Sequence, residues 1–144
     1  MTKKVLLAAL AILVIIQVFS IDKTNPPVDE SIDFFSTTQI PGDVMGLLKH
    51  ACADCHSYKT KYPWYTNIEP VSWWIKGHID HGRGNLNFSE WGDYSKEDQV
   101  HFIRECIEVI EEKRMPLTIY ALSHKEARLS DSDRQKMVEF FRNL

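Results

Sequence analysis

The sequence predicts an all-α fold, a small helical domain that follows an N-terminal apolar segment. Apolar residues recur at helical spacing in several segments, no segment alternates apolar and polar residues as a strand does, and there are no internal repeats. At 144 residues the chain has room for one domain and a short leader. Its formal charge of −3 provides no basic surface, so we expect no nucleic-acid partner.

The N-terminus contains a nearly unbroken apolar run from Val5 to Phe19 that follows two lysines. The run has the length of a signal-peptide core and, extended to Ile21, reaches the lower limit for a membrane span. Because only a poor cleavage site follows, we expect residues 1–21 to be an uncleaved anchor that contacts the membrane through residues 5–21. A cleaved signal peptide is the alternative. Either way the lysines place the rest of the chain on the outer face of the membrane.

Residues 22–40 are polar and contain two adjacent prolines, which predicts an extended, flexible linker. The helical domain is then expected over residues 41–144. Its first helix begins after Pro41 and Gly42 and has an apolar face that leads directly to Cys52. The residues of this face, spaced i, i+3, i+4 and i+7, are Val44, Leu47, Leu48 and Ala51.

Three more helices are expected after it, separated by loops at 57–69 and 83–94. One begins at Pro70 and ends near Gly82, and the next begins at Ser95, where Asp98 completes a variant of the capping box. The stripe predicted to be buried in that third helix comprises Val100, Ile103, Ile107 and Ile110. A last helix from Ser130 repeats the spacing of the first with Met137, Phe140, Phe141 and Leu144. We therefore expect the first and last helices to pack together and close the fold.

The most informative motif is C-x-x-C-H, formed by Cys52, Cys55 and His56. This spacing is the attachment signature of a c-type haem, in which two thiols add to the two vinyl groups of one porphyrin and the histidine is the proximal iron ligand. We therefore expect one covalently bound haem c in a small, cytochrome c-like domain. The predicted outer-face location agrees, because covalent haem attachment in bacteria takes place there.

Two alternatives for the cysteines are weaker. A zinc site needs four ligands, and only Cys106 remains without a second C-x-x-C or an H-x-x-x-H motif. A thioredoxin-like redox pair requires a βαβ setting that the sequence lacks. Cys106 itself is expected to be a small buried helix residue.

The second axial iron ligand determines what the haem can do. We expect Met115, because it follows the third helix directly and precedes Pro116, where the backbone leaves the helix. A thioether favours ferrous iron and raises the reduction potential. His78 and His81, three residues apart on one helix, are the alternatives and would give bis-histidine ligation.

Several further strings occur in order along the domain: Cys55-His56-Ser57, Tyr62-Pro63-Trp64-Tyr65, Ser72-Trp73-Trp74, Leu86-Asn87-Phe88-Ser89-Glu90-Trp91 and Met115-Pro116 followed by Tyr120 and His124. Together they resemble the bacterial haem-binding domain family, small C-x-x-C-H proteins found alone or beside di-haem cytochrome c peroxidase-like domains. The resemblance covers roughly residues 40–140. It implies covalent haem through Cys52 and Cys55 with His56 as ligand, and it makes Met115 a natural distal candidate.

The function expected from these features is electron transfer by a monohaem c-type cytochrome. Its partners would be membrane or periplasmic redox proteins, and a haem on a flexible linker suits a shuttle between them. An electron carrier is expected rather than an enzyme, since the neighbouring di-haem enzymes need a second C-x-x-C-H, which this sequence lacks. The alternatives are a haem-based redox or gas sensor and an accessory domain to a di-haem peroxidase-like system.

Overall fold

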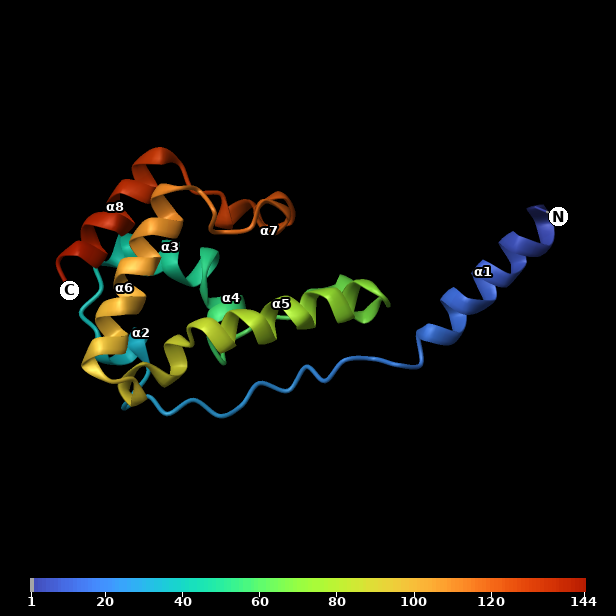
Figure 1. Ribbon diagram of the computed structural model, residues 1–144, viewed down its shortest axis with the longest axis horizontal. Coiled ribbons are helices and arrows are strands. Elements are labelled where there is room, and N and C mark those ends of the chain that lie inside the picture. The colour runs from blue at the N-terminus through green and yellow to red at the C-terminus, as the bar shows by residue number, and fades with distance from the viewer. Residues whose placement is uncertain (1) are drawn as a thin grey trace.

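The computed structural model describes residues 2–144 and contains, within them, only helices and connecting loops, which confirms the predicted all-α class. Figure 1 shows α1 (Thr2–Ile16) projecting away from a compact group of helices that includes α3, α6 and α8. After α1 the helices are, in chain order, α2 (Phe34–Thr37), α3 (Gly42–Ala51), α4 (Ala53–His56), α5 (Val71–Asn85), α6 (Lys96–Glu111), α7 (Thr118–Ser123) and α8 (Asp131–Arg142). Short 3-10 turns lie at η1 (Trp64–Asn67), η2 (Phe88–Asp93) and η3 (Lys125–Ala127).

The apolar segment forms a 15-residue helix, α1, whose side chains are exposed along nearly its whole length. A tighter turn continues it, since the N–H of Phe19 donates to the carbonyl of Ile16. Within residues 2–144 no helix combines the length and the apolar character that crossing a membrane requires. The fold therefore does not show the anchor predicted for residues 1–21.

The segment between α1 and α2 lies along the domain and is bonded to it, although the sequence predicts a flexible linker. Asn25 donates to the carbonyl of Thr60 at 2.8 Å and accepts from the Arg83 guanidinium at 2.9 Å. Figure 1 shows this segment running beside α5 on its way to α2. These contacts restrict the segment to one path over the domain surface.

The hydrophobic core is centred on Phe34, which is 0% exposed. Its ring lies 5.0 Å from the rings of both Phe88 and Trp91 and 6.4 Å from those of Phe140 and Phe141. Thus α2, which falls within the predicted linker, supplies the middle of the core. The packed domain begins well before residue 41.

The predicted helices are all present, and their ends follow the expected capping chemistry. The side chain of Ser95 accepts from the N–H of Asp98 at the start of α6. At the start of α8, Ser130 and Asp133 form a complete capping box. The first and last helices of the domain, α3 and α8, pack against each other as the matching apolar faces predict. The helix from Pro70 continues three residues past Gly82, to Asn85.

Two residues assigned to buried stripes are exposed instead. Val100 is 68% exposed because Gln99 takes the inward position on the first turn of α6, where its amide donates to the Trp91 carbonyl. Leu144 is 52% exposed because α8 ends at Arg142 and the chain leaves the helical face. The other predicted members of both stripes lie in or against the core.

We predict that Phe34→Ala lowers the free energy of unfolding by about 3–5 kcal/mol, because it removes the ring around which the aromatic core packs. Leu144→Ala, at an exposed position, should change it by less than about 0.5 kcal/mol. Denaturant unfolding followed by far-ultraviolet circular dichroism measures both. Equal effects of the two substitutions would contradict the central role of Phe34.

Candidate functional site

The C-x-x-C-H motif occupies a single helical turn at the junction of α3 and α4. Cys52 ends α3 and precedes α4, and its carbonyl accepts hydrogen bonds from the N–H groups of Cys55 and His56 at 3.2 and 3.0 Å. Ala53 faces the core, whereas Cys52, Cys55 and His56 are half-buried. The two thiols and the imidazole therefore project from one short turn that the core holds in place.

All three cysteines are free thiols. Burial raises the pKa of Cys52 to about 12 and that of Cys55 to about 11, so both are uncharged near neutral pH. Cys106, on α6, lies close enough to Cys52 for the two to interact, and burial likewise raises its pKa. Residues 2–144 contain no cluster of three or more histidine, cysteine or acidic side chains arranged to hold a metal ion.

His56 is held by a backbone carbonyl in one tautomer. Its Nδ1 lies 3.0 Å from the carbonyl oxygen of Leu86, and because a carbonyl only accepts, Nδ1 must carry the proton. The Nε2 lone pair is then available to a metal, as in histidine ligands oriented by a backbone carbonyl. Burial lowers the pKa of His56, which keeps the imidazole neutral.

A glycine sets the distance between the motif and the next long helix. A Cβ added at Gly82 would lie 2.7 Å from the carbonyl oxygen of Cys55, closer than van der Waals contact permits. Any other residue at this position would therefore push α5 away from α4. The same approach brings the chain after α5, with the Leu86 carbonyl, beside His56.

A cavity of about 420 Å³ opens beside the motif, between α4 and α5 on one side and α7 on the other. Figure 1 shows α7 lying across from α5. The wall is mainly apolar and aromatic, and includes Cys55, Tyr65, Ile75, His78, Leu117 and Tyr120. Both this volume and this lining are typical of cofactor pockets.

Polar side chains hold α7 against the motif. The single proton of the Tyr120 hydroxyl is shared between two acceptors, a carboxylate oxygen of Asp54 at 2.8 Å and the carbonyl oxygen of His50 at 3.1 Å. Burial and the charge of Asp54 raise the pKa of Tyr120, so the phenol keeps its proton. On the same side, His124 stacks on Tyr120 and lies 3.0 Å from the hydroxyl of Tyr65.

The predicted iron ligands occupy different places relative to the cavity. Cys55 and His78 are in its wall, whereas Cys52, His56 and Met115 are not. Met115 is half-buried, and its carbonyl accepts from Arg134 at 2.7 Å, just before Leu117 enters the cavity wall.

The two alternative histidines differ in their surroundings. His78 bonds through Nδ1 to the carbonyl of Trp74 at 2.8 Å. His81 is exposed, outside the cavity wall, and close enough to His56 for its charge to lower the pKa of that residue.

Several residues that shape the site were not predicted from the sequence. Gly82 was taken as the end of a helix, and only its contact with Cys55 reveals its role. Leu86 acts through its carbonyl, for which the side chain gives no signal. Asp54 is one of the two variable positions of the motif, yet it receives the Tyr120 hydroxyl and the N–H of Lys61.

These features together fit haem: two unpaired thiols, a neutral imidazole whose Nδ1 is held by the Leu86 carbonyl, and an apolar cavity with Cys55 in its wall. They define a small helical haem protein. The family model of the haem-binding domain matches residues 11–143, nearly the entire chain, so this protein belongs to the haem-binding domain family. The searches of curated proteins and of solved structures return no match.

We predict that Gly82→Ala reduces the haem content of the purified protein severalfold, because the new Cβ would displace the turn that carries the thiols. Gly84→Ala is the matched control, since it lies on the same helix and its Cβ would meet nothing within 4 Å. That variant should bind haem normally and change the free energy of unfolding by less than about 0.5 kcal/mol, because Gly84 is the last-but-one residue of α5. The haem-to-protein ratio from pyridine haemochrome spectra measures the effect, and normal haem content in Gly82→Ala would contradict it.

Proposed function

We propose that this chain is a monohaem c-type cytochrome that transfers electrons on the outer face of the cytoplasmic membrane. The proposal rests chiefly on His56, whose Nδ1–H is committed to the Leu86 carbonyl while its Nε2 remains available as a ligand. The imidazole comes directly after two unpaired thiols on the same turn. A haem bound there supplies a one-electron change at iron, which is the chemistry of an electron carrier.

Covalent attachment is supported by the spacing of Cys52 and Cys55 and by both being free thiols. Cys52 and Cys55 would each hold the haem through one thioether, formed by adding S–H across a vinyl group, an addition that would need no oxidant and lose no atom. Their raised pKa values keep both thiols protonated and disfavour thiolate–metal binding in the absence of haem. With a single C-x-x-C-H in the sequence, we propose one haem per chain.

Besides the proposed iron ligands, other residues of the chain would position the haem and exclude water from it. Apolar side chains such as Ile75 and Leu117 line the cavity beside Cys55. The bond from Tyr120 to Asp54 fastens α7 to the motif turn and so holds the far wall of the cavity in place. A fixed, water-poor cavity limits the rearrangement that accompanies a change of charge at the iron.

For the second axial ligand we propose Met115. It follows the turn at Lys113, whose φ of 58° ends α6, and it is fixed through its carbonyl by Arg134. The half-buried thioether belongs to the segment that leads into the cavity wall at Leu117. His78 is the second candidate, and its place in the cavity wall is the observation that favours it.

The first test is of covalent attachment. Produced with a haem-attachment system, the protein should keep its haem through denaturing electrophoresis and acid–acetone extraction. Cys52→Ser/Cys55→Ser should lose haem from the denatured chain, whereas Cys106→Ser should retain all of it, because only the motif thiols would form thioethers. Haem extracted completely from the native sequence would refute the covalent bond.

The second test identifies the distal ligand and, with it, the class of haem protein. With sulfur on the iron, the ferric protein should show the weak far-red sulfur-to-iron band and bind carbon monoxide poorly after reduction. Met115→Ala should abolish that band and lower the reduction potential, since the soft ligand is lost. Met45→Leu, which removes another half-buried thioether, should leave the spectrum unchanged.

Other spectra would select the alternatives. If Met115→Ala leaves the haem spectrum unchanged while His78→Ala makes the iron high-spin, the ligation is bis-histidine. That ligation is still compatible with electron transfer at a lower reduction potential. A native protein that is high-spin and binds carbon monoxide readily would refute electron transfer and favour a sensor or peroxidase-like role.

A further inference from the structure

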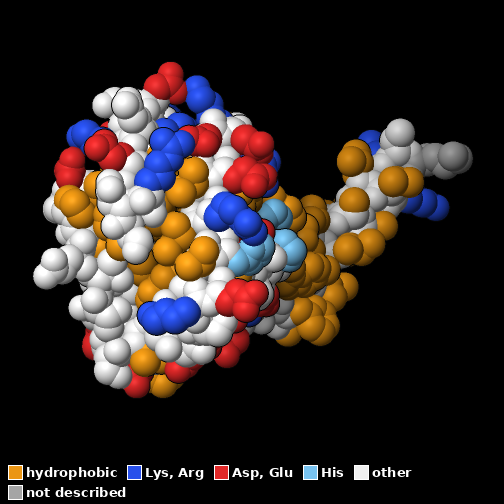
Figure 2. Space-filling model, turned by 60° about the vertical axis from the view of Figure 1, so that its left-hand side comes forward, with side chains coloured by type: hydrophobic (Ala, Val, Ile, Leu, Met, Phe, Trp, Pro, Cys, Tyr) orange, Lys and Arg blue, Asp and Glu red, His pale blue; other side chains and the backbone are white. Residues whose placement is uncertain are grey.

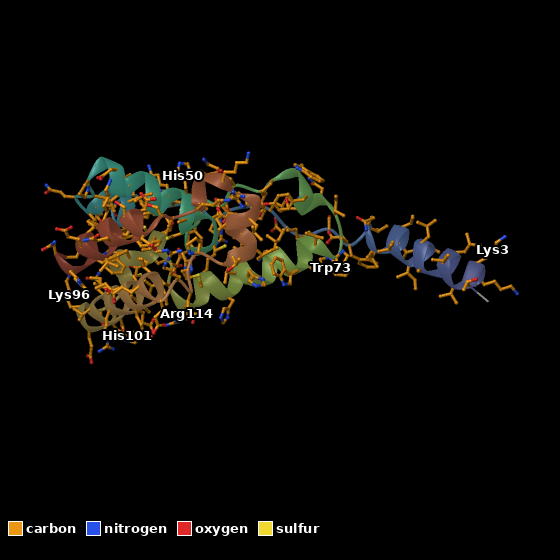
Figure 3. The ribbon with its side chains drawn as sticks, turned by 90° about the horizontal axis from the view of Figure 1, so that it is seen from above. Lys3, His50, Trp73, Lys96, His101 and Arg114 are labelled. Carbon is orange, nitrogen blue, oxygen red and sulfur yellow. The ribbon has the colours of Figure 1, made fainter. Side chains whose placement is uncertain are left out.

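The end of α1 is joined to one end of the domain by specific hydrogen bonds. The Gln17 side chain pairs with the backbone of Glu69, donating to its carbonyl and accepting from its N–H, both at 3.0 Å. The indole N–H of Trp73 donates to the carbonyl of Phe19 at 2.7 Å. The apolar segment therefore leaves the domain at the start of α5, and Figure 3 shows Trp73 at this end and Lys3 at the far tip of α1.

An exposed apolar surface surrounds this junction. Trp64, Ile68 and Trp73 are 75%, 43% and 40% exposed, and none of them lines the cavity. We refer to these three residues as the tryptophan surface. Figure 2 shows hydrophobic side chains gathered where α1 leaves the domain, continuous with those of the helix itself.

We propose that the tryptophan surface lies in the headgroup layer of a lipid bilayer while α1 inserts among the acyl chains. This inference rests on the proposed membrane location and adds a fixed orientation of the domain. Tryptophan is enriched at membrane interfaces, because its ring is apolar while its N–H remains polar. The exposed polar neighbours Lys61 and Asn67 suit the same layer.

The surroundings of α1 favour lipid over a protein partner. Val5, Leu6 and Leu7 are successive residues that point in different directions, and all three are at least 65% exposed. A helix that is apolar on every side needs a covering on every side, which lipid provides and a single docked protein face does not.

The length of α1 places the domain near the headgroups. Fifteen residues at about 1.5 Å each span roughly 22 Å, less than the roughly 30 Å of the hydrocarbon core. When an inserted segment is shorter than the core, its flanking residues are drawn toward the interface.

The orientation also sets where the cavity lies. Val71 and Trp74, on the first turns of α5, belong to the cavity wall and flank Trp73 of the tryptophan surface. In this orientation the part of the cavity wall formed by Val71 and Trp74 would lie close to the bilayer, within reach of a membrane-embedded electron donor.

The test uses the haem-loaded full chain in phosphatidylcholine–phosphatidylglycerol vesicles, with Cys106→Ser to remove the third thiol. A nitroxide is placed at Ile68→Cys on the tryptophan surface or at Lys96→Cys, which Figure 3 shows at the opposite end of the domain. Electron paramagnetic resonance then compares relaxation by oxygen, which concentrates in lipid, with relaxation by a water-soluble nickel complex. We expect the oxygen-to-nickel ratio to be severalfold higher at position 68.

A double tryptophan variant separates the possible results, with vesicle flotation and haem content measured as controls. Trp64→Ser/Trp73→Ser should lower the ratio at position 68 toward that at 96, while vesicle flotation and haem content stay unchanged. Equal ratios at both positions in a chain that still floats would overturn the proposed orientation alone. A chain that fails to float would overturn the membrane location as well, and its haem content would still report independently on the cytochrome.

Discussion

The backbone contact between Gly82 and Cys55 is the constraint on which the candidate site depends. It lets α5 approach the motif turn closely enough for the Leu86 carbonyl to reach His56, which fixes the tautomer and direction of the imidazole. The same approach sets one wall of the cavity, since Ile75 and His78 lie on α5. The absence of a side chain at Gly82 thus determines both the orientation of the His56 imidazole and the position of the cavity wall beside Cys55.

Much of the site could be predicted because its chemistry is local. The spacing of Cys52, Cys55 and His56 can be recognised from five consecutive residues of the sequence. The structure places this turn at the end of α3, whose apolar face the sequence also predicts. The long helices were predictable for a similar reason: apolar periodicity and capping serines lie within the segment they organise. The family match then agrees with the cofactor class that the motif indicates.

The parts that escaped prediction depend on contacts between distant segments. Phe34 sits in a polar stretch that reads as a linker, and it becomes the centre of the core only because η2 and α8 converge on it. Val100 fits an apolar stripe, but Gln99 turns inward to satisfy the carbonyl of Trp91. The choice of Met115 or His78 as a second axial ligand stays a prediction, because the two residues lie on separate elements whose approach to a bound haem depends on the tertiary fold.

The bonds that hold Asn25 to Thr60 and Arg83 bear on how an electron carrier of the proposed kind would reach a partner protein. A free tether lets a domain sweep a volume and sample many acceptors from one anchoring point. A segment bonded to the domain at Asn25 has a shorter free length, so the volume that the domain can reach from its anchoring point is smaller. For the proposed membrane-bound carrier, encounter rates would then depend more on lateral diffusion and on the surface density of a partner than on the reach of the linker.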